Sequence, residues 1–453
     1  MQAGEDEPTG RQLGRWSAQA IVSGSMLGIG IFIAPPVVAQ HVHSPVYFLV
    51  MWIAGGLAAL CGALCVAELG AMMPRAGGEY PYLRLAYGPG VAFSTGWLQL
   101  LATFPGSLAA MAVGTATFQL PVLLGGFVLE PVDLWLFTID GPTLWAVGIV
   151  LLLTALNHAG VVLSGAVQLV LTMVPLATLL AVSLFVVGDV GTVEVGPQHS
   201  LEVWPPPAAS ALAAAYLPVY FAYSGWNAAL YIGGEIRDPA RTLPRAVIGG
   251  TLAVLVLYVV LNAGFLTVFG VHGLAGVGEA GTAAAGALFG RVGVVVVTMM
   301  ILLAMLGSIN GSVMTGSRIG YAMAEQGHFP AVGGKLDERF GTPVFALWAQ
   351  AGLTIALILA QGFSALMSYS SCAMLISGSL VVYATVRLRK LQPERPRPYR
   401  LGWYPWVPAI YIASSLCVLA VLVYEQDLSV FMAAGWFALA LLGHHFLVRP
   451  RLR

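Results

Sequence analysis

The chain has 453 residues, of which 58% are hydrophobic and only 9% are charged, whereas charged residues make up about 25% of an ordinary soluble domain. This composition excludes a soluble globular protein and predicts a protein that crosses a lipid bilayer many times. The formal net charge is zero and by itself says nothing about binding partners; we expect no nucleic-acid partner.

Twelve apolar spans of about 20 residues follow one another along the chain, each long enough to cross a bilayer as a helix. Gly, Ala and Leu occupy all faces of these spans without period-two alternation, which favours helices over a β-barrel. We therefore expect an all-α fold with twelve transmembrane helices. The predicted spans are 16–40, 45–72, 91–118, 142–160, 164–187, 208–232, 245–270, 285–314, 343–361, 364–386, 405–424 and 428–447.

The first span is interrupted by the sequence SGSMLGIGIF at residues 23–32, where a plain membrane anchor would carry leucine and valine. The sixth span contains a similar interruption, YFAYSGWN at residues 220–227, shortly after Pro218. Interrupted helices at corresponding positions of two halves are the best sequence indication of a transporter site between inverted repeats. The alternative is that these Gly and Ser residues only permit close helix packing.

Glycine lets a membrane helix unwind at little cost and lets a ligand approach the backbone. Unwinding frees N–H groups at the start of one half-helix and carbonyl groups at the end of another. Together these groups complement the carboxylate and the ammonium of a zwitterion without any charged side chain. The two interruptions therefore predict that the ligand is an amino acid.

The charged residues all fall in loops, tails or helix ends, with Glu68 closing the second span and Glu235 closing the sixth. We expect a membrane midplane without charges, which argues against a cationic substrate held by a buried carboxylate and against a proton pump built on a midplane acid. Of the 20 Lys and Arg residues, only Arg291 falls on the outer side if the N-terminus is cytoplasmic. The positive-inside rule therefore predicts cytoplasmic tails at 1–15 and 449–453, with no cleavable signal peptide before the first span.

The sequence contains no recognisable catalytic or metal-binding cluster. Cys61 and Cys65 lie four residues apart in the second span, but no His or third Cys accompanies them. Such a lone pair is a poor signal for a metal site. We therefore expect no metal, no cofactor and no enzymatic activity.

Several motifs along the chain are more specific. They are GSMLGIGIF in the first span, CVAELGAMMPRAGGEYPYLRLAYGP after the second, FAYSGWN and GGEIRDPARTLPRAV around the sixth, GSINGSVMTGSRIGYAMAEQGHFP in the eighth, and PERPRPYR before the eleventh. In these motifs the chain resembles the amino acid-polyamine-organocation superfamily, in particular its L-type amino acid transporter branch. The resemblance implies the leucine-transporter fold, with inverted five-helix repeats at 16–188 and 208–390 and two peripheral helices within 401–448.

The resemblance also implies which residues bind the substrate. The backbone amides of 27–30, chiefly Ile29 and Gly30, would hold the carboxylate, and carbonyls near Met26, Phe221 and Ser224 would accept from the ammonium. Phe221 matches an aromatic gate, with simple bundle packing as the alternative, and Asn227 matches a position at which relatives with neutral substrates carry Asn. We expect small to medium neutral L-amino acids as substrates. The expected binding residues are Ser25, Met26, Leu27, Gly28, Ile29, Gly30, Phe221, Ser224, Gly225 and Asn227.

Polar residues of the eighth span are further candidates to line the site, although hydroxyl groups in membrane helices also bond back to their own backbone. They are Ser308, Asn310, Ser312 and Thr315. On the cytoplasmic side, charged residues are expected to form an ion-pair network that either gates or fixes the loop after the sixth span. They are Glu68, Glu235, Arg237, Asp238 and Arg241.

Pro175 occupies the position at which many sodium-independent relatives carry a lysine in the fifth helix. The chain either works without that cation or holds a sodium ion with helix 1 carbonyls and helix 8 hydroxyls. We expect sodium-independent exchange or facilitated transport, with sodium- or proton-coupled symport as the alternative.

The loop 120–142 contains no Cys, whereas animal relatives use one there to bind an accessory glycoprotein. We therefore expect a stand-alone bacterial inner-membrane protein without a disulfide-linked subunit. Neither the rings of a channel pore nor the acid, His or metal cluster of a membrane enzyme is visible. An amino acid-binding receptor or scaffold that does not transport is the remaining alternative of another class.

Overall fold

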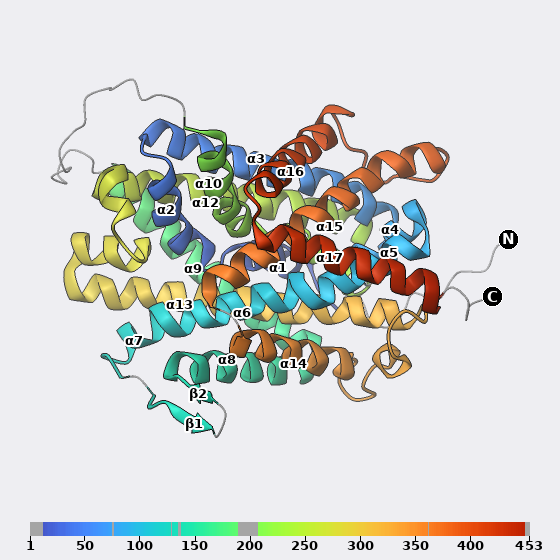
Figure 1. Cartoon of the computed structure of the whole chain (residues 1–453), viewed down its shortest axis with the longest axis horizontal. Coiled ribbons are helices and arrows are strands. Elements are labelled where there is room, and N and C mark those ends of the chain that lie inside the picture. Colours follow the sequence, from blue (N-terminus) through green and yellow to red (C-terminus); the bar gives the residue numbers. More distant parts are fainter. Residues whose placement is uncertain are drawn as a thin grey trace.

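The computed structural model describes residues 12–74, 77–127, 129–134, 137–188, 207–360 and 362–448. These residues form a bundle of helices with one small hairpin at its edge (Figure 1). The elements of the first half are α1 (Arg15–Met26), α2 (Gly30–His41), α3 (Pro45–Met72), α4 (Tyr80–Tyr87), α5 (Pro89–Leu98), η1 (Gln99–Thr103), α6 (Phe104–Gly114), η2 (Thr115–Gln119), α7 (Leu120–Leu123), β1 (Val132–Leu134), β2 (Phe137–Ile139), α8 (Gly141–His158) and α9 (Val161–Gly188).

The second half contains two much longer helices and the C-terminal pair. Its elements are α10 (Ala209–Ala222), α11 (Ala228–Tyr231), η3 (Gly233–Glu235), α12 (Pro239–Ala275), α13 (Ala280–Ala324), η4 (Ala331–Gly334), α14 (Val344–Ala360), α15 (Phe363–Leu391), α16 (Trp406–Tyr424), α17 (Leu428–Gly443) and η5 (His444–Val448).

Ten helical stretches of the described chain are long and apolar enough to cross a membrane, judged by length and composition, and α10 and α14 are shorter apolar helices. Together they coincide with the twelve predicted spans, so the prediction of an all-α polytopic membrane protein is confirmed. Helices α12 and α13 extend at both ends beyond their predicted spans of 245–270 and 285–314, and each contains a kink, at Gly270 in α12 and at Gly290 in α13. The predicted tails, with Arg11 and Arg449, lie outside the described residues.

The first and sixth spans are broken where their glycines predicted. The first ends as α1 at Met26 and restarts as α2 at Gly30, and the sixth ends as α10 at Ala222 and restarts as α11 at Ala228. Gly225 has φ +99°, and an added Cβ there would lie 2.7 Å from the carbonyl oxygen of Ser25. Only glycine adopts this left-handed conformation at no cost, so the two breaks touch each other at this position.

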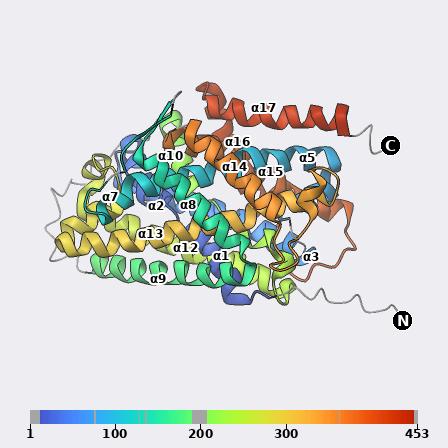
Figure 2. The same ribbon diagram turned by 90° about the horizontal axis from the view of Figure 1, so that it is seen from below.

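The remaining helices surround these two broken spans. Figure 2 shows α9 and α17 on opposite sides of the bundle, with α1, α12 and α13 between them. Helix α9 continues through Pro175 without a break. The broken helices therefore lie in the interior, where the other spans shield their unpaired backbone groups from lipid.

A backbone bridge joins the start of α1 to the segment that follows α11. The amides of Gln12 and Leu13 both donate to the carbonyl of Glu235 at 2.9 Å, and the amide of Arg237 donates to the carbonyl of Leu13 at 3.0 Å. Leu13 and Ile236 thereby form a parallel β-bridge. The segment that leads into the first broken span is thus hydrogen-bonded to the segment that follows the sixth.

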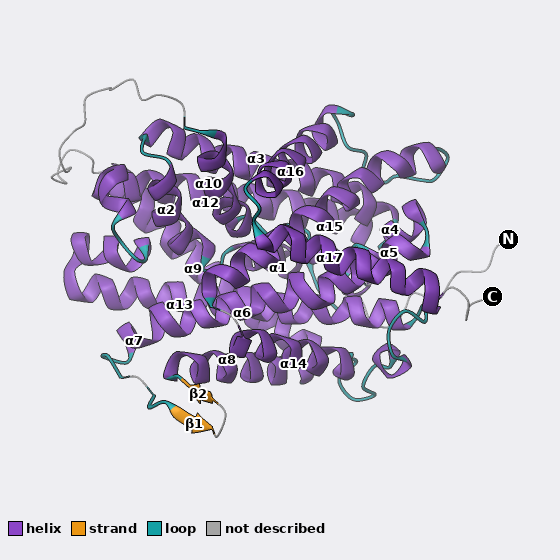
Figure 3. Ribbon diagram, in the orientation of Figure 1, coloured by secondary structure: helices purple, strands orange, loops and turns teal. Residues whose placement is uncertain are grey.

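The segment between α7 and α8, which we expected to be a plain loop, contains the antiparallel hairpin β1–β2. Val132 pairs with Ile139 and Leu134 with Phe137. Figure 3 shows this hairpin beside α8, at the margin of the helical bundle. Its strands are three residues each, so the fold class is unaffected.

Candidate functional site

A cavity lies between the two helix breaks. Most of the expected binding residues line it, whereas Leu27, whose side chain is fully buried in the core, does not. Ser308, Ser312 and Thr315 of α13 also line the cavity. The expected residues on its wall are Ser25, Met26, Gly28, Ile29, Gly30, Phe221, Ser224, Gly225 and Asn227.

The break in the first span places a helix start at this cavity. Gly30 begins α2, and the first N–H groups of a helix have no partner within that helix. The hydroxyl oxygen of Ser25 is buried and has no hydrogen-bond partner among the described residues. Free amides together with an unpaired hydroxyl form a site for an anionic group such as a carboxylate.

Two of the carbonyls that we expected to hold an ammonium are already engaged. The carbonyl of Met26 accepts from the Tyr258 hydroxyl at 2.5 Å and from the Gly28 amide at 2.9 Å. The carbonyl of Phe221 accepts from the hydroxyl of Ser224 at 2.7 Å and from its amide at 3.1 Å. Because a carbonyl oxygen has two lone pairs, neither group is free to bind an ammonium in this conformation.

Glu79 is a member of the site that the sequence did not predict. It precedes α4 and lies between the membrane-spanning helices, yet it is only 1% exposed and its side chain lines the cavity. The amide of Asn227 donates to one of its carboxylate oxygens at 2.5 Å, and the amide of Gln99 donates to the other. The expectation of a site without charged side chains is therefore wrong, because the chain segment between α3 and α4 turns back into the bundle.

Asn310 does not line the cavity and instead belongs to a buried polar cluster behind it. Its amide donates to the Gln168 side chain at 2.8 Å, and its carbonyl accepts from Asn157 at 2.8 Å. Gln168 in turn donates to Thr172 at 3.0 Å. A Cβ added at Gly24 would overlap both Gln168 and Thr172, so side chains of α9 fill the space beside the break in the first span.

The charged residues that we expected in one network form separate clusters. Glu235 pairs with Arg318 of α13 at 3.1 Å, a residue that was not among the expected members. Glu68, which is 1% exposed, instead binds the other end of the chain. Arg237 also has an interaction partner.

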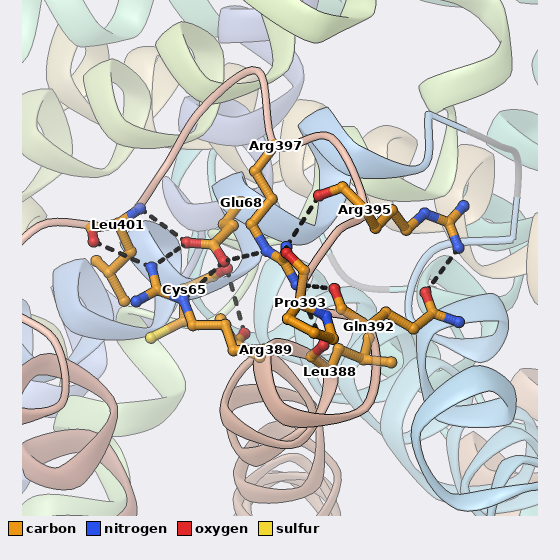
Figure 4. Close-up of polar contacts among 10 residues, drawn as sticks. Cys65, Glu68, Leu388, Arg389, Gln392, Pro393, Arg395, Arg397 and Leu401 are labelled. Carbon is orange, nitrogen blue, oxygen red and sulfur yellow. Dashed lines mark hydrogen bonds and ion pairs between the residues drawn. The ribbon is translucent and has the colours of Figure 1, made fainter.

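Figure 4 shows the surroundings of Glu68. Its carboxylate pairs with Arg389 at 2.5 Å and Arg397 at 3.2 Å, and it accepts from the backbone amide of Leu401 at 2.8 Å. Arg397 also donates to the carbonyls of Leu388 and Gln392. This cluster fixes the segment between α15 and α16 against the end of α3.

Comparison with known proteins gives a consistent result over nearly the whole chain. The family model described as amino acid permease matches residues 13–443. The chain is 29% identical to the human large neutral amino acids transporter small subunit 2 over 409 residues, which is 89% of this chain and 74% of the relative. It is 28% identical to the serine/threonine exchanger of Bacillus subtilis over 424 residues, or 92% of each protein. It is also 29% identical to the mouse Asc-type amino acid transporter 1 over 411 residues, 89% of this chain and 74% of that one.

Proposed function

Because the chain belongs to the amino acid permease family, we propose that it carries neutral L-amino acids across the membrane by alternating access at the cavity between its two broken helices. The observation that carries this proposal is the conjunction of the α2 start and the unpaired hydroxyl of Ser25 at that cavity. A helix N-terminus attracts a carboxylate through its free amides and its dipole. No catalytic role is assigned to any residue.

The contacts of Glu79 support a neutral substrate rather than a cationic one. Both of its carboxylate oxygens accept hydrogen bonds from Gln99 or Asn227. A cationic side chain would have to displace these donors, whereas a neutral side chain would not. The names of the similar proteins, which refer to neutral amino acids and to serine and threonine, agree with this choice.

We further propose that transport is exchange or facilitated transport without sodium. Gln168 and Thr172 fill the space beside Gly24 at the break in the first span, so a cation would have to displace them. One relative is named an exchanger. We propose that the transporter consists of two inverted repeats, 16–188 and 208–390. We also propose that both termini lie in the cytoplasm of a bacterium whose inner membrane holds the protein. Protease accessibility of tags placed at the two ends of the chain, in cells and in inverted vesicles, tests the orientation.

Counterflow into liposomes that contain the purified chain alone tests the function. A panel of all twenty radiolabelled L-amino acids should show saturable counterflow, with small to medium neutral substrates best. If Arg or Lys were the best substrate, the proposed specificity would be wrong. Saturable binding without counterflow would indicate a receptor, and activity only with an added partner would contradict a stand-alone transporter.

A further inference from the structure

Tyr411 of α16 reaches the substrate cavity from outside the two predicted repeats. Helix α16 is one of the two helices expected to be peripheral, and it packs against α3, α10 and α15 (Figure 1). The side chain of Tyr411 is nevertheless fully buried. Tyr411 is not among the described residues that line the cavity, so it can influence a substrate only through the wall residues that it contacts.

The first of these wall residues is Tyr220 of α10, which precedes Phe221 in the chain. The hydroxyl oxygens of Tyr220 and Tyr411 lie 2.9 Å apart and form a hydrogen bond. Tyr220 is only 7% exposed, and the hydroxyl group of a buried tyrosine usually has a hydrogen-bond partner. Tyr411 therefore supplies the partner that holds the Tyr220 ring in place at the cavity.

The second wall residue is Gly378 of α15. A Cβ added there would overlap the hydroxyl oxygen of Tyr411 and would lie 3.4 Å from that of Tyr220. Gly378 lies within a regular helix, where glycine is less favourable than alanine. The close approach of Tyr411, rather than the backbone conformation, therefore requires a glycine at this position.

The third wall residue is Trp226, in the break of the sixth span. Its ring meets the ring of Tyr411 edge to face, with 5.8 Å between the two centroids. Gly62 of α3 lies against both rings, because a Cβ added at this position would lie 2.8 Å from Trp226 and 2.9 Å from Tyr411. The backbone of α3 thus prevents a shift of either ring toward it.

The wall at Gly378 is available to the side chain of a substrate. The carboxylate of a zwitterion is expected at the start of α2, beside Ser25, so the substrate side chain has to lie against the other walls. On α15 the wall consists of Met374, Ser377 and Gly378, whose spacing places them on one face of the helix. Because Gly378 has no side chain, the two phenols that meet there limit the room for the substrate.

We propose that Tyr411 is a positioning residue that sets the largest amino acid side chain that the transporter accepts. It holds the Tyr220 ring at the cavity and fills the space at Gly378, so a long or aromatic substrate side chain would overlap phenols that are fixed in place. The side chains of alanine and serine are too short to reach them. The inference rests on the proposed transport of neutral amino acids and adds the residue that limits substrate size.

The experiment measures the apparent KM for L-alanine and for L-phenylalanine in counterflow, with the full chain in liposomes. The wild type should have the lower KM for L-alanine. In Tyr411→Leu the ratio of the KM for L-phenylalanine to that for L-alanine should fall about tenfold, since one methylene group in an apolar pocket is already worth about 10–200-fold. Tyr424→Leu, the same change at an 84% exposed position of α16, should keep the wild-type ratio. A purely structural defect would lower the amount of active protein and leave the ratio unchanged.

A second pair of variants tests the contact at Gly378 itself. Gly378→Ala should abolish counterflow, because the added Cβ overlaps the hydroxyl oxygen of Tyr411. Adding Tyr411→Phe removes that oxygen, and the nearest remaining atoms then lie 3.4 Å from the new Cβ. Counterflow should therefore return in the double variant, as expected for two residues in direct contact.

Three results would overturn the inference: a wild type that prefers L-phenylalanine, an unchanged KM ratio in Tyr411→Leu, or wild-type counterflow in Gly378→Ala. If Tyr411→Leu does not assemble, the double variant decides, and a double variant as inactive as Gly378→Ala would contradict the proposed contact. Absence of wild-type counterflow with every amino acid would instead contradict the proposed transport function. The two proposals therefore fail in different measurements.

Discussion

The hydroxyl of Tyr258 lies 2.5 Å from the carbonyl oxygen of Met26, the last residue of α1. It also lies 3.2 Å from the carbonyl oxygen of Ala222, the last residue of α10. The final carbonyls of a helix have no partner within that helix. One phenol of α12 therefore connects the ends of both broken spans, with its single hydrogen shared between the two carbonyls.

We predict that Tyr258→Phe weakens substrate binding about tenfold, which corresponds to about 1.4 kcal/mol. Removal of the hydroxyl takes one shared donor from the carbonyls of Met26 and Ala222, of which Met26 keeps the Gly28 amide, and a buried acceptor that loses its donor costs about 1–3 kcal/mol. Competition of unlabelled substrate in counterflow measures the affinity. Tyr87→Phe is the matched control, because it removes a phenol that donates to the carbonyl of Leu380 at 2.8 Å away from the cavity. Equal losses in both variants would contradict a specific role for Tyr258.

Gly30→Ala should abolish counterflow and lower the stability by about 1–3 kcal/mol, the usual range for an overpacked interior. The added Cβ would lie 2.6 Å from the backbone Cα of Ala222, which cannot move without separating the two broken spans. Thermal unfolding in detergent and counterflow in liposomes give the two readouts. Gly352→Ala in α14 is the control, since no atom lies within 4 Å of its added Cβ. Wild-type affinity in Gly30→Ala would show that close contact between the breaks is unnecessary.

Glu68→Gln should destabilise the fold by about 3–5 kcal/mol, because it leaves two arginines near a buried position without their counter-charge. Arg389 and Arg397 both pair with this carboxylate, and an amide cannot neutralise them. The midpoint of thermal unfolding should fall sharply, whereas Glu338→Gln, at an exposed position, should leave it in place. If Glu68→Gln shifted the midpoint of thermal unfolding only slightly, the contacts of Arg397 with backbone carbonyls would be sufficient to hold the segment between α15 and α16 without the ion pairs.

Counterflow of L-serine should proceed at the same rate in sodium, potassium and choline chloride. The side chains of Gln168 and Thr172 fill the space beside the break in the first span, and both are held by hydrogen bonds to neighbouring groups. A cation at this place would have to break these bonds. A rate that collapses in choline and recovers with sodium would contradict the sodium-independent proposal.

The two helix breaks were predictable because their cause is local. Glycine and serine in an apolar span weaken a helix regardless of its surroundings, so residues 23–32 and 220–227 could be recognised from the sequence alone. The face of α13 could also have been derived more carefully. Ser308, Ser312 and Thr315 are spaced four and three residues apart and share one side of a helix, whereas Asn310 points elsewhere.

Glu79 and Tyr258 could not be recognised in the same way, because tertiary packing decides their roles. The segment before α4 has the composition of an ordinary polar loop, but Gly77 and Gly78 both adopt positive φ and bring it against the interior. The ring of Tyr231 occupies the space into which a side chain at position 78 would project. This paired glycine directly before an acid was the available signal. Tyr258 offered none, since an aromatic residue in an apolar span is ordinary.

The backbone bridge between Leu13 and Ile236 has a kinetic consequence. Two gates that opened independently would give four combinations of open and closed, including leaky ones. Because the start of α1 is hydrogen-bonded to the segment that leaves the sixth span, we expect these two parts to move together, so that combinations in which only one of them moves are disfavoured. We therefore expect opening at this end to occur in one step.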